Sequence, residues 1–195
     1  MPRRTDVIEL AVLGVLEDAP MHGYHLRKHV TALLGPWRAA LSFGTLYPTL
    51  RRLQASGYVS AAVVPGTAAK VVYQITDPGR ARFRRLLAHP GAGLSDDDFG
   101  VRFAFFARLD PADRVRVLEQ RLLRLLDRLD DVAARGCADP ADTRDPYRRA
   151  WAQRGVASVE SELRWTEARL AAERSAADGG YGHAGVSGVD TTSPP

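Results

Sequence analysis

Hydroxyl and guanidinium side chains recur along one short stretch of the sequence. The polar residues of this stretch are Ser42, Thr45, Tyr47, Thr49, Arg51 and Arg52. Such side chains hydrogen-bond phosphate oxygens and the exposed edges of bases in nucleic acids. Between them, Leu46, Leu50 and Leu53 recur at helical spacing and would form a buried stripe. We therefore expect a helix over residues 43–56 whose polar face can contact DNA. The alternative is an ordinary amphipathic surface helix.

Local signals define the two ends of this helix. Ser42 suits the N-cap position, where a hydroxyl accepts a hydrogen bond from the first turn. Pro48 is tolerated only near the first turn, because proline has no N–H to donate. Gly57 stands where a helix of this length would end.

Other reactive residue types do not combine into a catalytic or metal site. His25 and His29 lie four residues apart, but no cysteine or helical carboxylate accompanies them as a further ligand. The acidic run 96–98 stands at a helix start, where capping and the helix dipole explain it. The single cysteine, Cys137, is isolated. Since no phosphate-binding loop or hydrolase motif occurs either, the sequence predicts no enzyme, no cofactor and no metal site.

The segments before the polar helix predict two further helices. Residues 7–16 are almost entirely apolar, as in a helix at the centre of a small domain, and the break at 18–20 ends it. A second helix opens at residues 22–24, carries an apolar stripe and closes near Gly35 and Pro36; the stripe is Leu26, Val30, Leu33 and Leu34. Three short helices separated by breaks are the components of a helix-turn-helix.

The segments after Gly57 predict a hairpin and a fourth helix. Residues 58–64 and 71–76 are rich in β-branched and aromatic side chains, and the Gly-containing segment 65–70 between them forms a turn. Residues 77–87 then begin with Asp-Pro-Gly and continue as a basic helix. Helix, helix, helix, hairpin and helix, in this order, predict a winged helix-turn-helix with a two-stranded wing.

Four motifs within residues 7–88 resemble the PadR family of bacterial transcriptional regulators. They are Leu10–Leu16, His22–Tyr24, Gly44–Leu53 and Tyr73–Gly79. The resemblance implies a homodimeric repressor that binds an inverted-repeat operator in double-stranded DNA. It also implies that the helix over 43–56 enters the major groove, while the hairpin over 58–76 lies near the minor groove or backbone.

The same resemblance extends the predicted DNA contacts beyond this helix. Tyr24 and Lys28 are expected to support binding at the DNA backbone, and Lys70 is expected to make the wing contact. Wings of the family usually carry several basic residues, whereas this tip offers Lys70 among Gly, Thr and Ala. Val72 also stands where an aromatic residue is common. We expect this wing to add little electrostatic affinity.

The charge of the chain is unevenly distributed. Residues 1–88 contain 12 Lys and Arg against 5 Asp and Glu, although the whole chain has a net charge of only +4. The basic excess therefore lies on the predicted winged helix, as binding to the phosphate backbone requires. Since no transmembrane run or signal peptide is evident, we expect a cytoplasmic protein.

The C-terminal half is predicted to be all-α. After a linker at 89–93, helical segments cover 97–108, 111–135 and a stretch that opens at 145. The long leucine stripe of the middle segment is difficult to bury within one chain, so we expect these helices to build a homodimer, with an intramolecular three-helix bundle as the alternative. The expected organisation is a DNA-binding domain at 1–88, a dimerisation domain at 94–176 and a disordered tail at 177–195.

Five aromatic residues of this half are candidates for binding a small aromatic or apolar effector. They are Phe99, Phe103, Phe106, Trp151 and Trp165. The three phenylalanines share a helix face by spacing, and the tryptophans are large enough to line a cleft. The alternative is that all five belong to the dimer core. For the chain as a whole, the alternative function is a helical adaptor module with a degenerate winged helix.

Overall fold

The computed structural model describes residues 4–33, 43–64, 70–90, 95–136 and 145–180. The chain divides into two compact units, residues 1–124 and 125–195. In chain order the elements are α1 (Arg4–Asp18), β1 (Met21–His22), α2 (Gly23–Leu33), α3 (Phe43–Ala55), β2 (Val59–Val64), β3 (Lys70–Ile75), α4 (Asp77–Ala88), α5 (Asp96–Phe103), the 3-10 helix η2 (Phe106–Arg108), α6 (Pro111–Gly136) and α7 (Pro146–Gly180).

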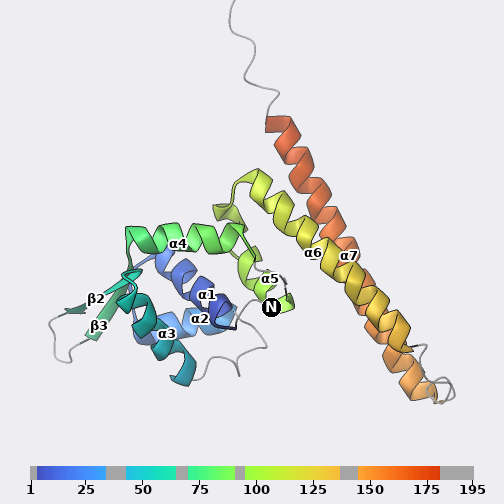
Figure 1. Ribbon diagram of the computed structural model, residues 1–195, viewed down its shortest axis with the longest axis horizontal. Helices are drawn as coiled ribbons and strands as arrows, with labels where there is room; N and C mark the ends of the chain where they lie inside the picture. Colours follow the sequence, from blue (N-terminus) through green and yellow to red (C-terminus); the bar gives the residue numbers. More distant parts are fainter. Residues whose placement is uncertain (1–3, 34–42, 65–69, 91–94, 137–144, 181–195) are drawn as a thin grey trace, which may run out of the picture. The chain divides into compact units, whose positions relative to one another are not determined.

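Helix α1 forms the centre of the first unit. It contacts α2, α3, α4, α5 and β3, which surround it in Figure 1. Because neighbours cover it on most sides, its side chains from Val7 to Leu16 are buried around the whole helix rather than along one stripe. This arrangement confirms the central helix that the apolar run predicted.

Helices α2 and α3 pack on α1 through the predicted apolar stripes. Leu26 and Val30 of α2 are fully buried, as are Leu46, Leu50 and Leu53 of α3. The expected end of the second helix near Gly35 and Pro36 lies outside the described residues. One detail of α3 was predicted incorrectly. Pro48 lies inside the helix, in its second turn, where it removes the N–H that would otherwise bond to the Gly44 carbonyl.

Gly57 ends α3 as predicted. Its φ of 72° lies in the left-handed region, which glycine adopts without strain. The Gly57 N–H donates to the Gln54 carbonyl, and the Tyr58 N–H donates to the Leu53 carbonyl, both at 2.9 Å. These bonds satisfy the last carbonyls of the helix and turn the chain into β2.

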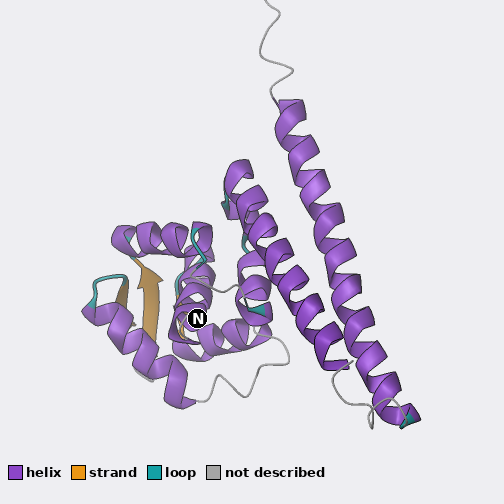
Figure 2. Ribbon diagram, turned by 45° about the vertical axis from the view of Figure 1, so that its right-hand side comes forward, coloured by secondary structure: helices purple, strands orange, loops and turns teal. Residues whose placement is uncertain are grey.

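The wing is part of a three-stranded antiparallel sheet with the order β1-β3-β2. Strands β2 and β3 form the predicted hairpin, in which Ala61 lies opposite Tyr73. The third strand, β1, was not predicted, because two residues are too short to show an alternating pattern. It pairs Met21 with Tyr73 and so ties the start of α2 to the wing (Figure 2).

Helix α4 begins at a cap that also contacts the end of α3. The Thr76 hydroxyl accepts a hydrogen bond from the Gly79 N–H at 3.1 Å and donates one to the Gly57 carbonyl at 2.6 Å. One side chain therefore links the last strand of the wing, α4 and the turn that follows α3.

The expected continuous helix over 97–108 is wrong. Helix α5 ends at Phe103, and the short helix η2 follows after Phe105, whose φ of −111° and ψ of 14° are not helical. The break turns the Phe105 ring toward α1 and Phe83, with which it makes an edge-to-face contact at 5.4 Å between ring centroids. A gain in buried aromatic surface thus accompanies the loss of a continuous helix.

Segment 95–109 is anchored to the rest of the first unit by two arginines. The buried Arg102 donates from Nη1 to the carbonyls of Leu86 and Leu87, at 3.0 Å for Leu87, and from Nε to Asp98 at 3.0 Å. It therefore satisfies carbonyls at the C-terminal end of α4. Arg108 pairs with Asp18 at the end of α1.

In the second unit, α7 carries a buried stripe at helical spacing. Its buried side chains are Val159, Leu163, Thr166 and Leu170. The Thr166 hydroxyl donates to the Glu162 carbonyl at 2.8 Å, which satisfies this buried polar group. Helix α7 continues to Gly180, so residues 177–180 are helical and not part of a disordered tail. Within the described residues, we find no helix with the length and apolar character needed to cross a bilayer.

Candidate nucleic-acid interface

Helix α3 presents a polar face formed by Tyr47, Arg51 and Arg52. Arg51 and Arg52 are exposed, and Tyr47 is half-buried. Thr49 is only 5 % exposed, so its hydroxyl is not part of this face. Ser42 and the side chain of Thr45 lie outside the described part of the chain. Of the six predicted contacts on this helix, three therefore lie on its described surface.

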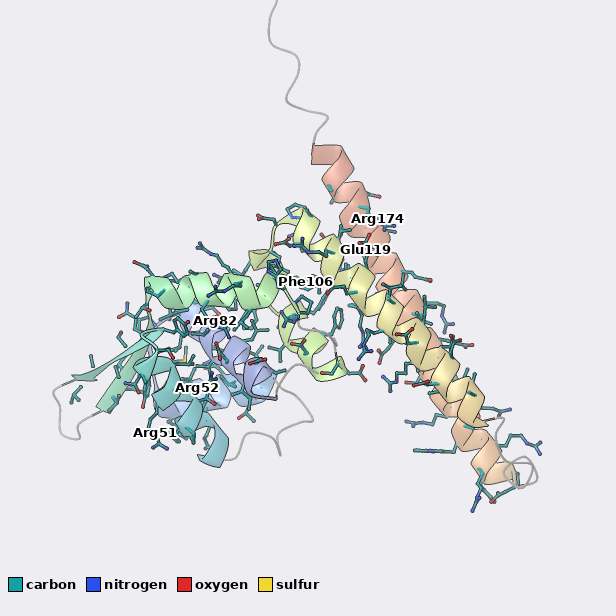
Figure 3. The ribbon with its side chains drawn as sticks, viewed as in Figure 1. Arg51, Arg52, Arg82, Phe106, Glu119 and Arg174 are labelled. Atoms are coloured by element: carbon teal, nitrogen blue, oxygen red, sulfur yellow. The ribbon has the colours of Figure 1, made fainter. Side chains whose placement is uncertain are left out.

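Arg52 is paired with a buried carboxylate that the sequence analysis missed. Its Nη2 lies 2.8 Å from Oε2 of Glu9, which is only 1 % exposed on α1. Arg82 of α4 donates from Nε to Glu9 Oε1 at 2.7 Å, so two arginines from different helices share one carboxylate. Figure 3 labels both arginines on the helices that flank α1. The single charge within the apolar run 7–16 was the available signal, because a lone buried carboxylate requires partners.

A hollow of about 430 Å³ lies beside the exposed face of α3. It is lined by His22, Gly23, Tyr24, His25, Tyr47, Val71 and Tyr73. These residues come from β1, α2, α3 and β3, so the hollow exists only when the helices and the wing are assembled. A Cβ atom at Gly23 would stand 3.3 Å from Cε2 of Tyr73 and 3.5 Å from the Tyr47 hydroxyl. The absence of a side chain there keeps both rings accessible.

Tyr73 is the titratable group whose pKa is perturbed in this hollow. Burial raises the pKa of its phenol above the usual value of 10.0, the neighbouring Tyr47 raises it further, and the Arg51 guanidinium acts in the opposite direction. The Tyr73 hydroxyl therefore remains protonated at neutral pH and can donate a hydrogen bond. From its sequence pattern, Tyr73 is expected in a strand and in a family motif, but not among the residues that contact DNA.

Helix α2 contributes exposed residues to the same side of the domain. Tyr24 and Lys28 are both exposed, as the predicted backbone contacts require. The Arg27 guanidinium lies 5.8 Å from the centroid of the Tyr24 ring, at the distance of a cation–π contact. In the parts of the chain that the structure describes, no cluster of three or more potential metal ligands occurs.

The described part of the wing offers an exposed apolar surface. Val63 and Val71 face each other in neighbouring strands and are both exposed. Lys70 begins β3 opposite Val64, but its side chain lies outside the described residues. This surface agrees with the low content of basic residues in the wing sequence.

The predicted effector residues fall into two groups. Phe99, Phe103 and Phe106 cluster in the first unit, with ring centroids 5.7 Å apart for Phe99–Phe103 and 4.9 Å apart for Phe103–Phe106. Phe99 and Phe106 are buried, whereas Phe103 is half-buried. Trp151 and Trp165 lie on α7 in the second unit, and both are exposed. The three phenylalanine rings thus fill space against one another.

These features together define a class of DNA-binding fold. Three helices, a hairpin and a fourth helix, with an exposed polar face on the third helix, form a winged helix-turn-helix domain. Residues 12–85 match the model of the transcriptional regulator PadR-like family.

The comparison with solved structures finds PadR regulators at low sequence identity. Bacillus subtilis PadR in complex with operator DNA is 21% identical and has a TM-score of 0.40, with 86% of this chain and 99% of that chain covered. The same protein in complex with p-coumaric acid is 20% identical, with a TM-score of 0.39 and coverages of 89% and 98%. The PadR-like regulator BC1756 from Bacillus cereus is 22% identical, with a TM-score of 0.37 and coverages of 89% and 97%. No curated protein matches the chain.

Proposed function

We propose that this protein is a sequence-specific DNA-binding repressor whose α3 helix enters the major groove. The observation that carries the proposal is the exposed face of α3 in a domain of the PadR-like family. Arg51 can form a bidentate contact with a phosphate or a guanine, and Tyr47 can donate through its hydroxyl. Tyr24 and Lys28 add contacts to the DNA backbone from α2. We propose that this binding takes place in the cytoplasm.

We further propose that the repressor acts as a homodimer on an inverted repeat. Large apolar side chains are exposed on the two long helices, among them Leu123, Leu126, Trp151 and Trp165. Exposed apolar side chains in such number favour a protein–protein contact, and a second copy of the chain is the partner that the proposed inverted repeat requires. The two α3 helices would then read half-sites about 34 Å apart.

Selection from random duplex DNA, followed by footprinting, tests this function. We expect the selected sequences to share an inverted repeat, and the footprint to cover two half-sites on one face of the duplex. The stoichiometry of the complex, measured by light scattering, should be two chains per duplex. Selected sequences without a shared motif, together with no steep dependence of affinity on salt, would instead support the adaptor alternative.

We also propose that a small aromatic compound regulates DNA binding at the phenylalanine cluster. Phe103 is the ring of this cluster that remains partly exposed, so an added aromatic ring can stack there. Regulation requires that the compound bind one state of the protein more tightly than the other. Calorimetric titration with planar aromatic acids tests this directly. Binding that persists unchanged in the Phe103→Ala variant would contradict this location.

A further inference from the structure

Four elements bring hydrogen-bond donors to the hollow beside α3. The Tyr47 hydroxyl comes from the recognition helix, and the Tyr73 hydroxyl comes from the central strand of the wing sheet. Gly23, Tyr24 and His25 form the first turn of α2, whose N–H groups have no partner within their own helix. His22, on β1, completes the rim with a ring nitrogen 3.3 Å from the Val71 carbonyl.

A positive charge from outside the lining acts on one of these residues, Tyr73. The Arg51 guanidinium interacts electrostatically with the Tyr73 phenol and lies one helical turn from Tyr47 on α3. Hydroxyl donors beside a guanidinium suit an anion, because each can direct a hydrogen or a charge at its oxygens. No aspartate or glutamate is among the residues that line the hollow.

We propose that this hollow binds one phosphodiester of the DNA backbone through the Tyr47 and Tyr73 hydroxyls, with Arg51 beside them. The proposal rests on the proposed DNA-binding function and assigns Tyr73 as a residue that contacts DNA. A phosphate held between α2, α3 and the wing fixes the depth at which α3 enters the groove, since phosphate contacts set the register of a protein on the duplex.

Neutral and charged contacts to one phosphate affect the salt dependence of DNA affinity differently. A phenol releases no counterion when it binds, so removing its hydroxyl lowers the affinity equally at every salt concentration. Removing Arg51 instead reduces the slope of log K against log salt by about one unit for each chain bound, and so by about two units for the proposed dimer. The phosphate contact is also independent of base sequence, so the loss should be equal on specific and non-specific duplexes.

The Tyr73→Phe variant of the full chain tests the proposal. We expect its affinity for duplex DNA to fall about tenfold for each chain bound, the loss expected for one hydrogen bond to a charged group, and so about a hundredfold for the proposed dimer, with an unchanged salt slope. The matched control is Tyr147→Phe, which removes the hydroxyl of a residue that is 84 % exposed on α7 and should bind as the wild type does. Gly23→Ala is a second variant: its Cβ narrows the hollow and should weaken binding while Tyr73 remains.

Duplexes that carry a single neutral methylphosphonate identify the phosphate. Scanned along the site, one position in each half-site should weaken the wild type at least about tenfold when substituted, and should weaken Tyr73→Phe by a smaller factor, because Tyr47 and Arg51 remain in that variant. Wild-type affinity in Tyr73→Phe, or a loss restricted to particular base pairs, would overturn the phosphate assignment. If the wild type itself binds no duplex, the proposed function fails instead, so the two failures are distinguishable. Should Tyr73→Phe be poorly folded, the methylphosphonate scan with Gly23→Ala decides the question.

Discussion

The ring of Phe105 occupies the space that a side chain at Gly14 would need. A Cβ atom built on Gly14 would lie 2.7 Å or less from three carbons of that ring. Gly14 is in the middle of α1, where glycine is intrinsically unfavourable, so its presence there reflects this close approach. The contact fixes the segment between α5 and η2 against the central helix of the winged-helix domain.

We predict that Gly14→Ala destabilises the protein by about 1–3 kcal/mol, because the new methyl group must displace the Phe105 ring. Urea unfolding monitored by circular dichroism measures this. Gly100→Ala is the control, since a Cβ there meets no atom of the described residues within 4 Å. The double variant Gly14→Ala with Phe105→Leu should lose less free energy of unfolding than the sum of the losses in the two single variants. Strictly additive losses would show that the two residues do not compete for space.

The buried carboxylate of Glu9 should be required for stability. The Glu9→Gln variant removes the buried charge that Arg52 and Arg82 share, and we expect it to lower the free energy of unfolding by about 3 kcal/mol. Glu160→Gln, at an exposed position of α7, should change it by less than about 0.5 kcal/mol. Equal stabilities of the two variants would mean that the buried ion pairs have no net effect.

Arg102 should stabilise the end of α4 through its buried guanidinium. Arg102→Met leaves the Leu87 carbonyl and Asp98 without this donor, and we expect a loss of about 3–5 kcal/mol. Amide hydrogen exchange should accelerate most in the last turn of α4. Arg84→Met, on the exposed side of the same helix, is the matched control. Uniform acceleration across the first unit would indicate global destabilisation rather than the loss of a local anchor.

The phenol of Tyr73 should ionise above the usual range of tyrosine. Burial raises its pKa above 10.0, so the difference in phenolate absorbance between wild type and Tyr73→Phe should appear at higher pH than for a model tyrosine. Because the folded state favours the protonated phenol, its contribution to stability is complete below about pH 10 and is lost as the pH rises through the folded-state value. A difference signal with a midpoint below 10 would contradict this.

Arg51 and Arg52 should differ in their effect on DNA binding. Arg52 is 46 % exposed but shares Glu9 with Arg82, whereas the charge of Arg51 acts on the proposed phosphate site. We expect Arg51→Gln to reduce the salt slope by about one unit for each chain bound and Arg52→Gln to reduce it by less. Titrations at several salt concentrations measure both slopes. Equal reductions would show that Arg52 leaves Glu9 and binds DNA.

Most of the fold was predictable because its elements carry local signals. The apolar run of α1, the leucine stripe and terminal Gly57 of α3, and the strands of the wing follow from periodicity and residue preference. The polar residues of α3 could be placed on a helix for the same reason. Arg51 and Tyr47, identified from the sequence, do lie on its described surface.

Tertiary structure decided what depends on contacts between distant segments. The break after Phe103 exists because burying Phe105 against Gly14 and Phe83 outweighs the helical preference of a short segment. The burial of Thr49 and the pairing of Arg52 with Glu9 likewise depend on how α3 packs against α1, and helical spacing alone does not specify that rotation. The hollow around Tyr73 has the same origin, since residues separated by up to 51 positions line it together. Periodicity identifies which face of an element is buried, whereas only packing determines which side chains meet.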